Sequence, residues 1–144
     1  MLVSDILKHK GGEVKTARSD ETAMCVAKRL KSERVGALVV SDDGWSLDGI
    51  ISERDIAFGL AAHGAGLYAI PVADLMTRSV ITCGPRDSIA QVMSVMTQRR
   101  IRHLPVRDGN RLIGVISIGD VLKHRLGELE LEANVLRDYA IARG

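Results

Sequence analysis

Two Ser-x-x-Asp steps are the residues in this sequence whose types and spacing could do chemistry. Ser52 and Asp55 form the first step, and Ser117 and Asp120 form the second. Each step follows a short apolar run, which is the pattern of a helix N-terminus closed by a capping box. Capping alone explains these residue types, but such a helix end also offers free N–H groups and a positive dipole to a phosphate. Its carboxylate can in addition accept two hydroxyl groups.

Both steps lie inside an internal repeat. Four segments of the first half return in the same order in the second half. They are residues 3–7 with 72–76, 23–30 with 89–96, 34–40 with 100–106, and 49–56 with 114–121. The second pair carries an apolar stripe at helical spacing in both copies. Four matches in one order indicate a duplicated unit and therefore two related pockets.

Each half predicts a β-α-β-β-α order behind a short lead-in helix. The expected elements are a strand at residues 14–16 or 80–82, a helix at 20–31 or 87–98, a hairpin of 36–41 with 47–51 or 102–107 with 112–116, and a last helix after each Ser. Turn residues at 42–44 and 108–110 support the hairpins. Residues 63–66 have the composition of a loop that leads through a connector into the second lead-in helix.

The last helix of the second half continues beyond its counterpart, because the segment from Leu122 to Ala142 contains no proline. It keeps an apolar stripe among charged residues, formed by Leu126, Leu129, Ala133, Leu136 and Ala140. This amphipathic tail predicts either a partner or packing of the tail onto its own domain. We therefore divide the chain into residues 1–66, residues 67–125 and a helical extension at residues 126–144.

Composition limits the class of protein. The 144 residues can bury one substantial core, but halves of about 65 residues would be marginal alone, so we expect them to cover each other's apolar faces. A net charge of +2, from 20 basic and 18 acidic residues, argues against a broad nucleic-acid surface. No apolar run reaches the ~20 residues of a membrane span, and charge comes too early for a signal peptide, so we expect a cytoplasmic protein. Cys25 and Cys83 are expected to be two buried free thiols, without metal-site spacing.

The segments GIISERDI, GVISIGDV and RRIRHLPVRDGNRLIGVIS give the chain a resemblance to a tandem pair of CBS domains, from about Val3 to about His124. The resemblance implies an α+β fold, in which two pseudo-twofold-related repeats pack as one module with an extended C-terminal helix. It also implies a regulatory sensor of an adenine nucleotide. AMP is the first candidate, and ADP, ATP, NAD(H) and S-adenosylmethionine are the others. A homodimer and an unidentified regulated protein are the implied partners, with no metal and no membrane.

The resemblance carries roles to individual residues. Asp55 and Asp120 would bind the ribose, and Ser52 and Ser117 would lie toward the phosphate. Basic side chains at Arg102 and His103 would reach the phosphates, although a solvated strand edge also explains them. Their counterparts in the first repeat, Gly36 and Ala37, carry no charge, so the two pockets are expected to differ. Arg54 would compensate, or is an ordinary surface arginine, and Thr16 and Thr82 would touch ribose or phosphate, or are ordinary strand threonines.

Each implied pocket combines residues of both repeats. One would unite Thr16, Val35 and Ala37 with Arg102, His103, Ser117 and Asp120. The other would unite Thr82, Ile101 and His103 with Ser52, Arg54 and Asp55. The first pocket would have the stronger phosphate clamp, which makes it the preferred nucleotide site, and Val35 and Ala37 would leave an apolar slot for a base.

Two other functions compete with a nucleotide sensor. A structural dimerisation module would use the Ser-x-x-Asp steps as caps only. A single-stranded nucleic-acid binder would use the basic pair Arg99-Arg100 beside Arg102, but few aromatic residues and near-neutral charge argue against it. An enzyme is not expected, because the sequence has neither a Walker loop nor a Ser/His/Asp set at recognisable spacing.

Overall fold

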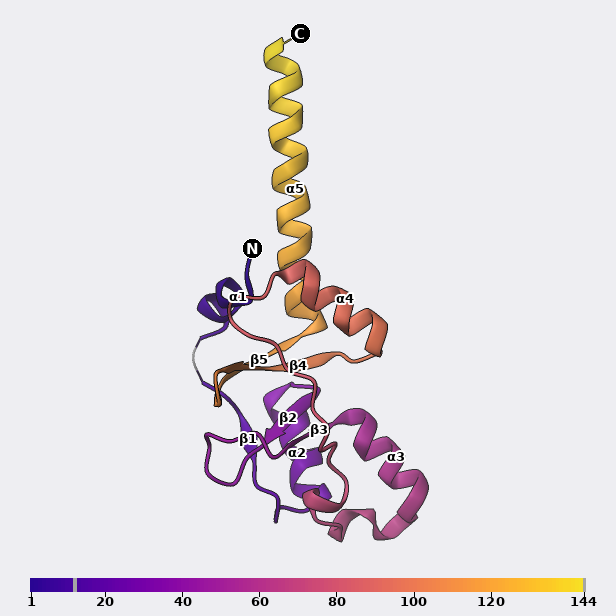
Figure 1. Ribbon diagram of the computed structural model, residues 1–144. Helices are drawn as coiled ribbons and strands as arrows, with labels where there is room; N and C mark the ends of the chain where they lie inside the picture. Colours follow the sequence, from indigo (N-terminus) through magenta and orange to yellow (C-terminus); the bar gives the residue numbers. More distant parts are fainter. Residues whose placement is uncertain (12, 144) are drawn as a thin grey trace.

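The computed structural model describes residues 1–11 and 13–143. The helices are α1 (Val3–Lys10), α2 (Ala23–Glu33), α3 (Glu53–His63), α4 (Ile89–Arg99) and α5 (Ile118–Arg143). The strands are β1 (Thr16–Ala17), β2 (Ala37–Val40), β3 (Gly49–Ser52), β4 (His103–Asp108) and β5 (Arg111–Ser117). Figure 1 shows β1, β2 and β3 in one half of the body and β4 and β5 in the other, with α5 projecting away. The predicted α+β architecture of two repeats and a long C-terminal helix is confirmed.

Each repeat contains the expected antiparallel hairpin. In the first sheet β1 runs parallel to β2, and β2 pairs antiparallel with β3, which places Ala37 opposite Ser52. In the second sheet β4 pairs antiparallel with β5, which places His103 opposite Ser117. Gly44 and Gly109 take the positive φ values that the hairpin turns require, 82° and 63°. The hairpins therefore bring the start of one strand beside each Ser-x-x-Asp step.

The strand expected at residues 80–82 does not form, and the prediction was wrong there. Its place is taken by a single parallel bridge between Cys83 and Val106. The Cys83 amide donates to the Pro105 carbonyl at 3.0 Å, and the Arg107 amide donates to the Cys83 carbonyl at 2.9 Å. Extending this ladder toward residue 81 would need an N–H from Pro105, which proline lacks. The first repeat has Val39 at the matching position, and there β1 forms.

Two other local predictions also need correction. Residues 63–66 are not an open loop, because a 3₁₀ helix begins at Gly64 and runs to Ala69. The second lead-in segment is a short 3₁₀ helix, Val72–Asp74, and not an α-helix. Its length is limited because Thr77 exchanges backbone hydrogen bonds with Ile50, at 2.9 and 3.0 Å, and this pairing draws the chain into an extended conformation.

The two hydrophobic cores exchange their lead-in segments. Val3 and Ile6 of α1 are fully buried in the core of the second repeat, together with α4, β4 and β5. Val72 belongs in turn to the core of the first repeat, where Leu75 and Met76 pack against it. Each half is thus completed by a segment that precedes the other half in the sequence. The expectation that the halves cover each other's apolar surface is met through this exchange.

Close packing of the exchanged segments explains one glycine in each repeat. A Cβ atom on Gly114 would lie 2.5 Å from Leu7 Cδ2. A Cβ atom on Gly49 would lie 2.8 Å from Met76 Sδ and 2.9 Å from the Thr77 carbonyl oxygen. Leu7 and Met76 are aligned residues of the two lead-in segments. The glycine that opens each repeated motif therefore makes room for the lead-in segment of the other half.

One of the two cysteines is buried as expected, and the other is not. Cys83 is buried, and burial, with a smaller effect of Asp87, raises the pKa of its thiol to about 12. Cys25 is exposed, so its predicted burial was wrong. The buried residues of α2 are Ala23, Val26 and Leu30, and Cys25 lies outside that stripe. No helix among the described residues has the length and apolar character needed to cross a membrane.

Candidate functional site

Both Ser-x-x-Asp steps form capping boxes at helix N-termini. At α3 the Ser52 amide donates to Asp55 Oδ2 at 2.8 Å, and the Asp55 amide donates to Ser52 Oγ at 3.4 Å. At α5 the Ser117 amide donates to Asp120 Oδ2 at 2.9 Å, and the Asp120 amide donates to Ser117 Oγ at 3.2 Å. The expected caps are therefore present, and one oxygen of each carboxylate is used by the cap.

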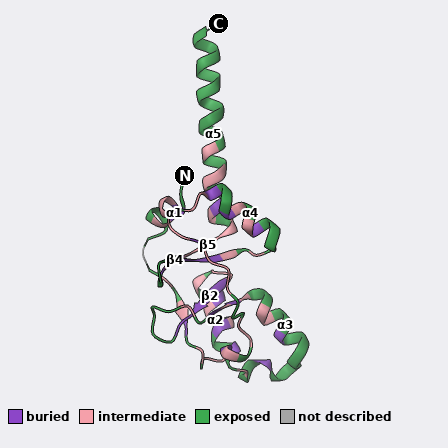
Figure 2. Cartoon of the chain, viewed as in Figure 1, coloured by how far each residue is buried: buried purple, intermediate pink, exposed green. Residues whose placement is uncertain are grey.

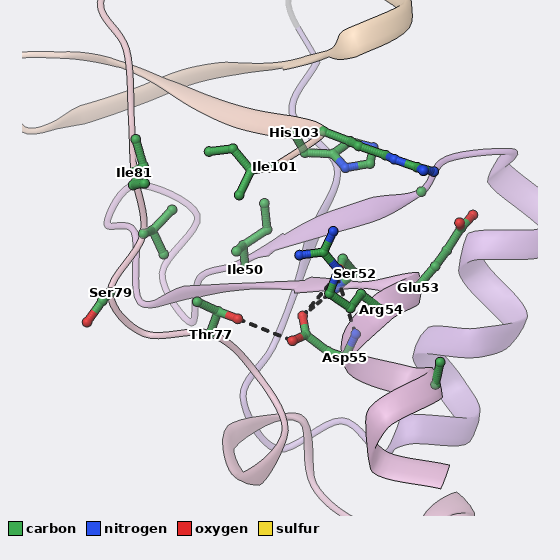
Figure 3. Close-up of a pocket in the computed structure, with 14 residues that line it drawn as sticks. Ile50, Ser52, Glu53, Arg54, Asp55, Thr77, Ser79, Ile81, Ile101 and His103 are labelled. Carbon is green, nitrogen blue, oxygen red and sulfur yellow. Dashed lines mark hydrogen bonds between the residues drawn. The ribbon is translucent and has the colours of Figure 1, made fainter. Parts of the chain in front are cut away.

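The first step opens into a cavity of about 420 Å³, which we call the Ser52 cavity (Figure 3). Its apolar lining comes from Ile50, Val80, Ile81 and Ile101. Its polar lining comes from Ser52, Glu53, Arg54, Asp55, Thr77, Ser79, Arg102 and His103. The cavity thus joins an apolar wall to a polar end that holds the N-terminus of α3, as pockets for small molecules commonly do.

The second step opens into a cavity of about 430 Å³, which we call the Ser117 cavity. Val35 and Ala37 line it from the first repeat, and Ser117 and Asp120 line it from the second. Three cationic side chains also line it: Lys10 at the end of α1, Lys15 before β1 and Arg34 after α2. The lining of the Ser117 cavity therefore includes two lysines, whereas that of the Ser52 cavity includes none.

Most of the residues that were predicted to share a pocket do line the same cavity. The structure brings Ile101 and His103 to the first Ser-x-x-Asp step, together with Arg54. It brings Val35, Ala37 and His103 to the second step. Each cavity is built across the two repeats as expected. The roles of these residues in binding a ligand stay predictions.

Arg102 lies in a different cavity from the one predicted. It lines the Ser52 cavity, whereas the sequence grouped it with Asp120. Arg102 directly precedes β4 and lines the Ser52 cavity, whereas the next residue, His103, lines both cavities. The phosphate clamp predicted at the Ser117 cavity therefore lacks Arg102 and keeps His103.

Thr16 and Thr82 were also placed one residue too far along the chain. Neither is among the residues that line the two cavities, and the residues before them, Lys15 and Ile81, are. Because side chains alternate in extended segments, a register error of one residue reverses the side that faces the cavity. The carbonyl oxygen of Thr16 instead accepts a hydrogen bond from Arg29 Nη1 at 2.7 Å.

The two aspartates differ in the partner that each carboxylate meets outside its cap. Thr77 Oγ1 donates to Asp55 Oδ1 at 3.2 Å, as Figure 3 shows. Lys10 Nζ donates to Asp120 Oδ2 at 2.8 Å and to the Val115 carbonyl at 3.0 Å. Sequence reasoning missed both Thr77 and Lys10, which lie just beyond the aligned lead-in segments. One aspartate therefore faces a neutral hydroxyl group, and the other faces a charged ammonium group.

The ion pair changes the electrostatics of Asp120. Burial acts to raise the pKa of this carboxyl, but the hydrogen bonds from Lys10 and Ser117 and the charge of Lys10 outweigh it and lower the pKa below its usual value. The Asp120 side chain is 24% exposed and the Lys10 side chain 41% exposed, so solvent screens the pair only in part. Asp120 is thus ionised and already paired before any ligand arrives.

His103 forms a wall shared by the two cavities, since it lines both of them. Burial lowers the pKa of its imidazole, while Glu53 and Asp120 act to raise it and Lys10 and Arg102 act to lower it. A Cβ atom on Gly36 would lie 2.8 Å from His103 Cε1. Glycine at position 36 therefore lets the imidazole lie between the two cavities.

Arg54 bridges the two repeats. Its Nη2 donates to the carbonyl oxygen of Arg100 at 3.1 Å. Arg100 caps the C-terminus of α4 in the left-handed conformation, with φ of 54°. The side chain of Arg54 thus reaches from the start of α3 to the end of α4 while it lines the Ser52 cavity.

A comparison with known protein families agrees with the division into two repeats. The family model for the CBS domain matches residues 3–62 and 72–127. The chain belongs to the CBS-domain family. Each match includes one Ser-x-x-Asp step, and residues of both matched repeats line each cavity. Among the described residues, no group of three or more His, Cys, Asp or Glu side chains could hold a metal ion.

Two curated relatives are proteins named for their CBS domains. The mitochondrial CBS domain-containing protein CBSX3 of Arabidopsis thaliana is 35% identical over 145 residues, which cover 95% of this chain and 70% of the relative. The CBS domain-containing protein YhcV of Bacillus subtilis is 31% identical over 114 residues, which cover 79% of this chain and 80% of the relative. The chain is thus similar to stand-alone CBS proteins.

Solved structures show the same fold. A CBS-domain containing protein from Agrobacterium tumefaciens superposes with a TM-score of 0.83 at 40% identity, covering 87% of this chain and 99% of that one. The CBS domain pair of protein MJ0100 superposes with a TM-score of 0.78 at 30% identity, covering 89% of this chain and 98% of that one. That CBS pair was solved in complex with 5′-methylthioadenosine and S-adenosyl-L-methionine.

Proposed function

We propose that this CBS pair is a regulatory module that binds an adenine nucleotide between its repeats and signals its occupancy to a partner protein. AMP is the first candidate ligand, and ADP, ATP, NAD(H) and S-adenosylmethionine are the alternatives. The observation that carries the proposal is Asp55, a carboxylate at a helix N-terminus that opens into a partly apolar cavity. The module itself catalyses no reaction, and its cytoplasmic location is part of the same proposal.

The Ser52 cavity supports each part of such a ligand. The isoleucines at positions 50, 81 and 101 offer an apolar surface to a purine. Asp55 would accept the ribose hydroxyls, replacing the hydroxyl of Thr77. Arg54, Arg102 and His103 line the same cavity and would meet the phosphate, with the positive end of α3 beside them.

The Ser117 cavity is the weaker of the two in this proposal. Lys10 Nζ already lies 2.8 Å from Asp120 Oδ2, the oxygen that also accepts from the Ser117 amide, so a ribose at Asp120 would meet a carboxylate that is already ion-paired. The two compounds bound by the CBS pair of MJ0100 both contain adenosine, which supports an adenosine-containing ligand here.

Isothermal titration calorimetry tests this function. The purified chain is titrated with AMP, ADP, ATP, NAD, NADH and S-adenosylmethionine. We expect one of them to bind, and Asp55→Ala to weaken that binding about 10- to 100-fold, because a hydrogen bond to a charged group contributes about 1.5–3 kcal/mol.

The control must separate loss of a ligand contact from loss of a helix cap. Ser88→Ala serves this purpose, because Ser88 caps α4 through a 3.1 Å hydrogen bond from the Gln91 amide and lines neither cavity. Ser88→Ala should lower stability while leaving ligand affinity unchanged. Absence of binding by all six compounds, or equal affinity of Asp55→Ala and the unmodified chain, would instead favour the structural dimerisation module.

A further inference from the structure

The C-terminal half of α5 has no packing partner within the chain. Val121 is the buried residue of this helix, and every described residue from 129 to 143 is exposed. Figure 1 shows α5 leaving the body, and Figure 2 shows its outer part exposed all around. The free part is about 22 Å long. An isolated helix of this length is marginal in water, so its apolar side chains call for a partner.

One set of apolar residues on α5 follows a heptad repeat, whereas Leu131, Val135 and Ile141 lie outside it. Successive members of one stripe are separated by four, three, four, three and four residues: Leu122, Leu126, Leu129, Ala133, Leu136 and Ala140. Alternating steps of four and three give a period of 3.5 residues, which is the period of a left-handed coiled coil. Leu126, Leu129 and Leu136 are 58%, 44% and 68% exposed. In heptad lettering, the d positions are Leu122, Leu129 and Leu136, and the a positions are Leu126, Ala133 and Ala140.

The flanking charges select the orientation of a second copy. Arg125 and Glu132 lie at g positions, and Lys123, Glu130 and Arg137 lie at e positions. In a parallel, in-register pair, each g residue faces the e residue five positions later in the other helix. Arg125 would then face Glu130, and Glu132 would face Arg137. Both contacts join opposite charges.

An antiparallel pair with the same overlap would join like charges. It would set Glu130 against Glu130, Glu132 against Glu132, and Lys123 against Arg137. Juxtaposed like charges oppose association, whereas complementary ones fix its register. From the heptad and these charges we propose that α5 forms a parallel, in-register two-stranded coiled coil with α5 of a second copy of this chain.

This dimer does not depend on nucleotide binding and is tested without ligand. Light scattering after gel filtration gives the mass of the native chain and of variants in the free part of α5. The native chain should have twice the protomer mass of 15.6 kDa, and the double variant Leu129→Glu/Leu136→Glu should have that mass once. Leu131→Glu is the matched control, because Leu131 is 66% exposed on the same helix but lies at an f position outside the stripe.

Disulfide trapping tests the orientation. Ala140→Cys is made in a Cys25→Ser background, and buried Cys83 is left in place. Oxidation should link two chains in a parallel pair, whereas an antiparallel pair would hold the two thiols about 27 Å apart along the axis. Asp138→Cys at an f position is the control and should not be linked. A monomeric native chain, a dimer that survives Leu129→Glu/Leu136→Glu, or equal linking of the two cysteine variants would overturn the proposal.

Discussion

The Ser52 and Ser117 cavities carry the same capping step in different surroundings. Asp55 and Asp120 each give one oxygen to the cap, with nearly equal distances of 2.8 and 2.9 Å from the serine amide. Outside the cap, Asp55 meets the hydroxyl of Thr77 and Asp120 meets the ammonium of Lys10. The two repeats thus share the capped helix end, whereas Thr77 and Lys10, just beyond the lead-in segments, give the two aspartates chemically different surroundings.

The largest difference between the two cavities is expected when their aspartates are replaced. Asp55→Ala should weaken nucleotide binding about 10- to 100-fold, and Asp120→Ala should weaken it less than about tenfold, since Asp120 is already paired with Lys10. Calorimetric titration of the two variants with the best ligand measures both losses. Equal losses would mean that the partner of the carboxylate does not decide which cavity is used.

Alanine at Gly49 and alanine at Gly114 should lower the free energy of unfolding by different amounts. Gly49→Ala brings a Cβ atom within 2.9 Å of the Thr77 backbone oxygen, whereas Gly114→Ala meets Leu7 only through the ends of its side chain. Because a backbone moves less readily than a rotamer, Gly49→Ala should lower the free energy of unfolding by about 1–3 kcal/mol and Gly114→Ala by less. Urea unfolding gives the two values. A larger loss for Gly114→Ala would show that the second core is the less adaptable one.

His103 should make nucleotide binding depend on pH. Burial lowers the pKa of this imidazole below 6.5 in the free protein, and a bound phosphate would raise it again. The complex would then take up a proton, so affinity should rise as pH falls through the pKa of the complex, by at most about tenfold per pH unit. Titrations across this pH range compare the native chain with His103→Gln, in which the part due to the imidazole should vanish. An unchanged slope would remove His103 from the phosphate end.

The same histidine should affect stability in the opposite sense. With a lowered pKa in the folded state, the unfolded chain binds more protons near pH 6.5, so the free energy of unfolding should fall as pH drops below that value. His103→Gln should lack this part of the decline. Denaturant unfolding in the absence of ligand measures it, and parallel curves for the two proteins would contradict the burial of the imidazole.

The smallest effect concerns the ion pair itself. Lys10→Met should lower the free energy of unfolding at neutral pH by about 1 kcal/mol or less, because the pair is partly exposed. The pKa of Asp120 is lowered from 3.8 in the folded state, so the contribution is present above pH 3.8 and is lost as pH falls through the folded pKa. Unfolding curves of the native chain and Lys10→Met should therefore converge in acid. Thr77→Val, which removes the uncharged partner of Asp55, is the matched variant for the other cavity.

Much of this fold could be predicted because its signals are local. The capping boxes need residues only three positions apart, and the hairpin turns need glycine at positions such as 44 and 109. The cross-repeat grouping of Ala37 with Asp120 followed from the family resemblance. These predictions depend on short spacings or on a known architecture, so the sequence was sufficient for them.

The errors arise where distant segments decide the outcome. Pro105 removes the N–H that a strand at residues 80–82 would need, although nothing in that segment itself is unfavourable. Arg102 was assigned to the wrong cavity because the direction of a side chain beside a strand depends on register. Lys10 reaches Asp120 across 110 positions of sequence, and no spacing rule connects residues so far apart.

The exchanged lead-in segments bear on how such a chain could have arisen. Val3 and Ile6 complete the core that contains Ile116, while Val72 completes the core that contains Ile51. A single-repeat ancestor built on the same plan could have closed its core only by trading lead-in segments with another copy of itself. Gene duplication would then have tethered two chains that were already mutually dependent. By the same logic, two fragments made by cutting this chain between the repeats should assemble with each other more readily than either folds alone.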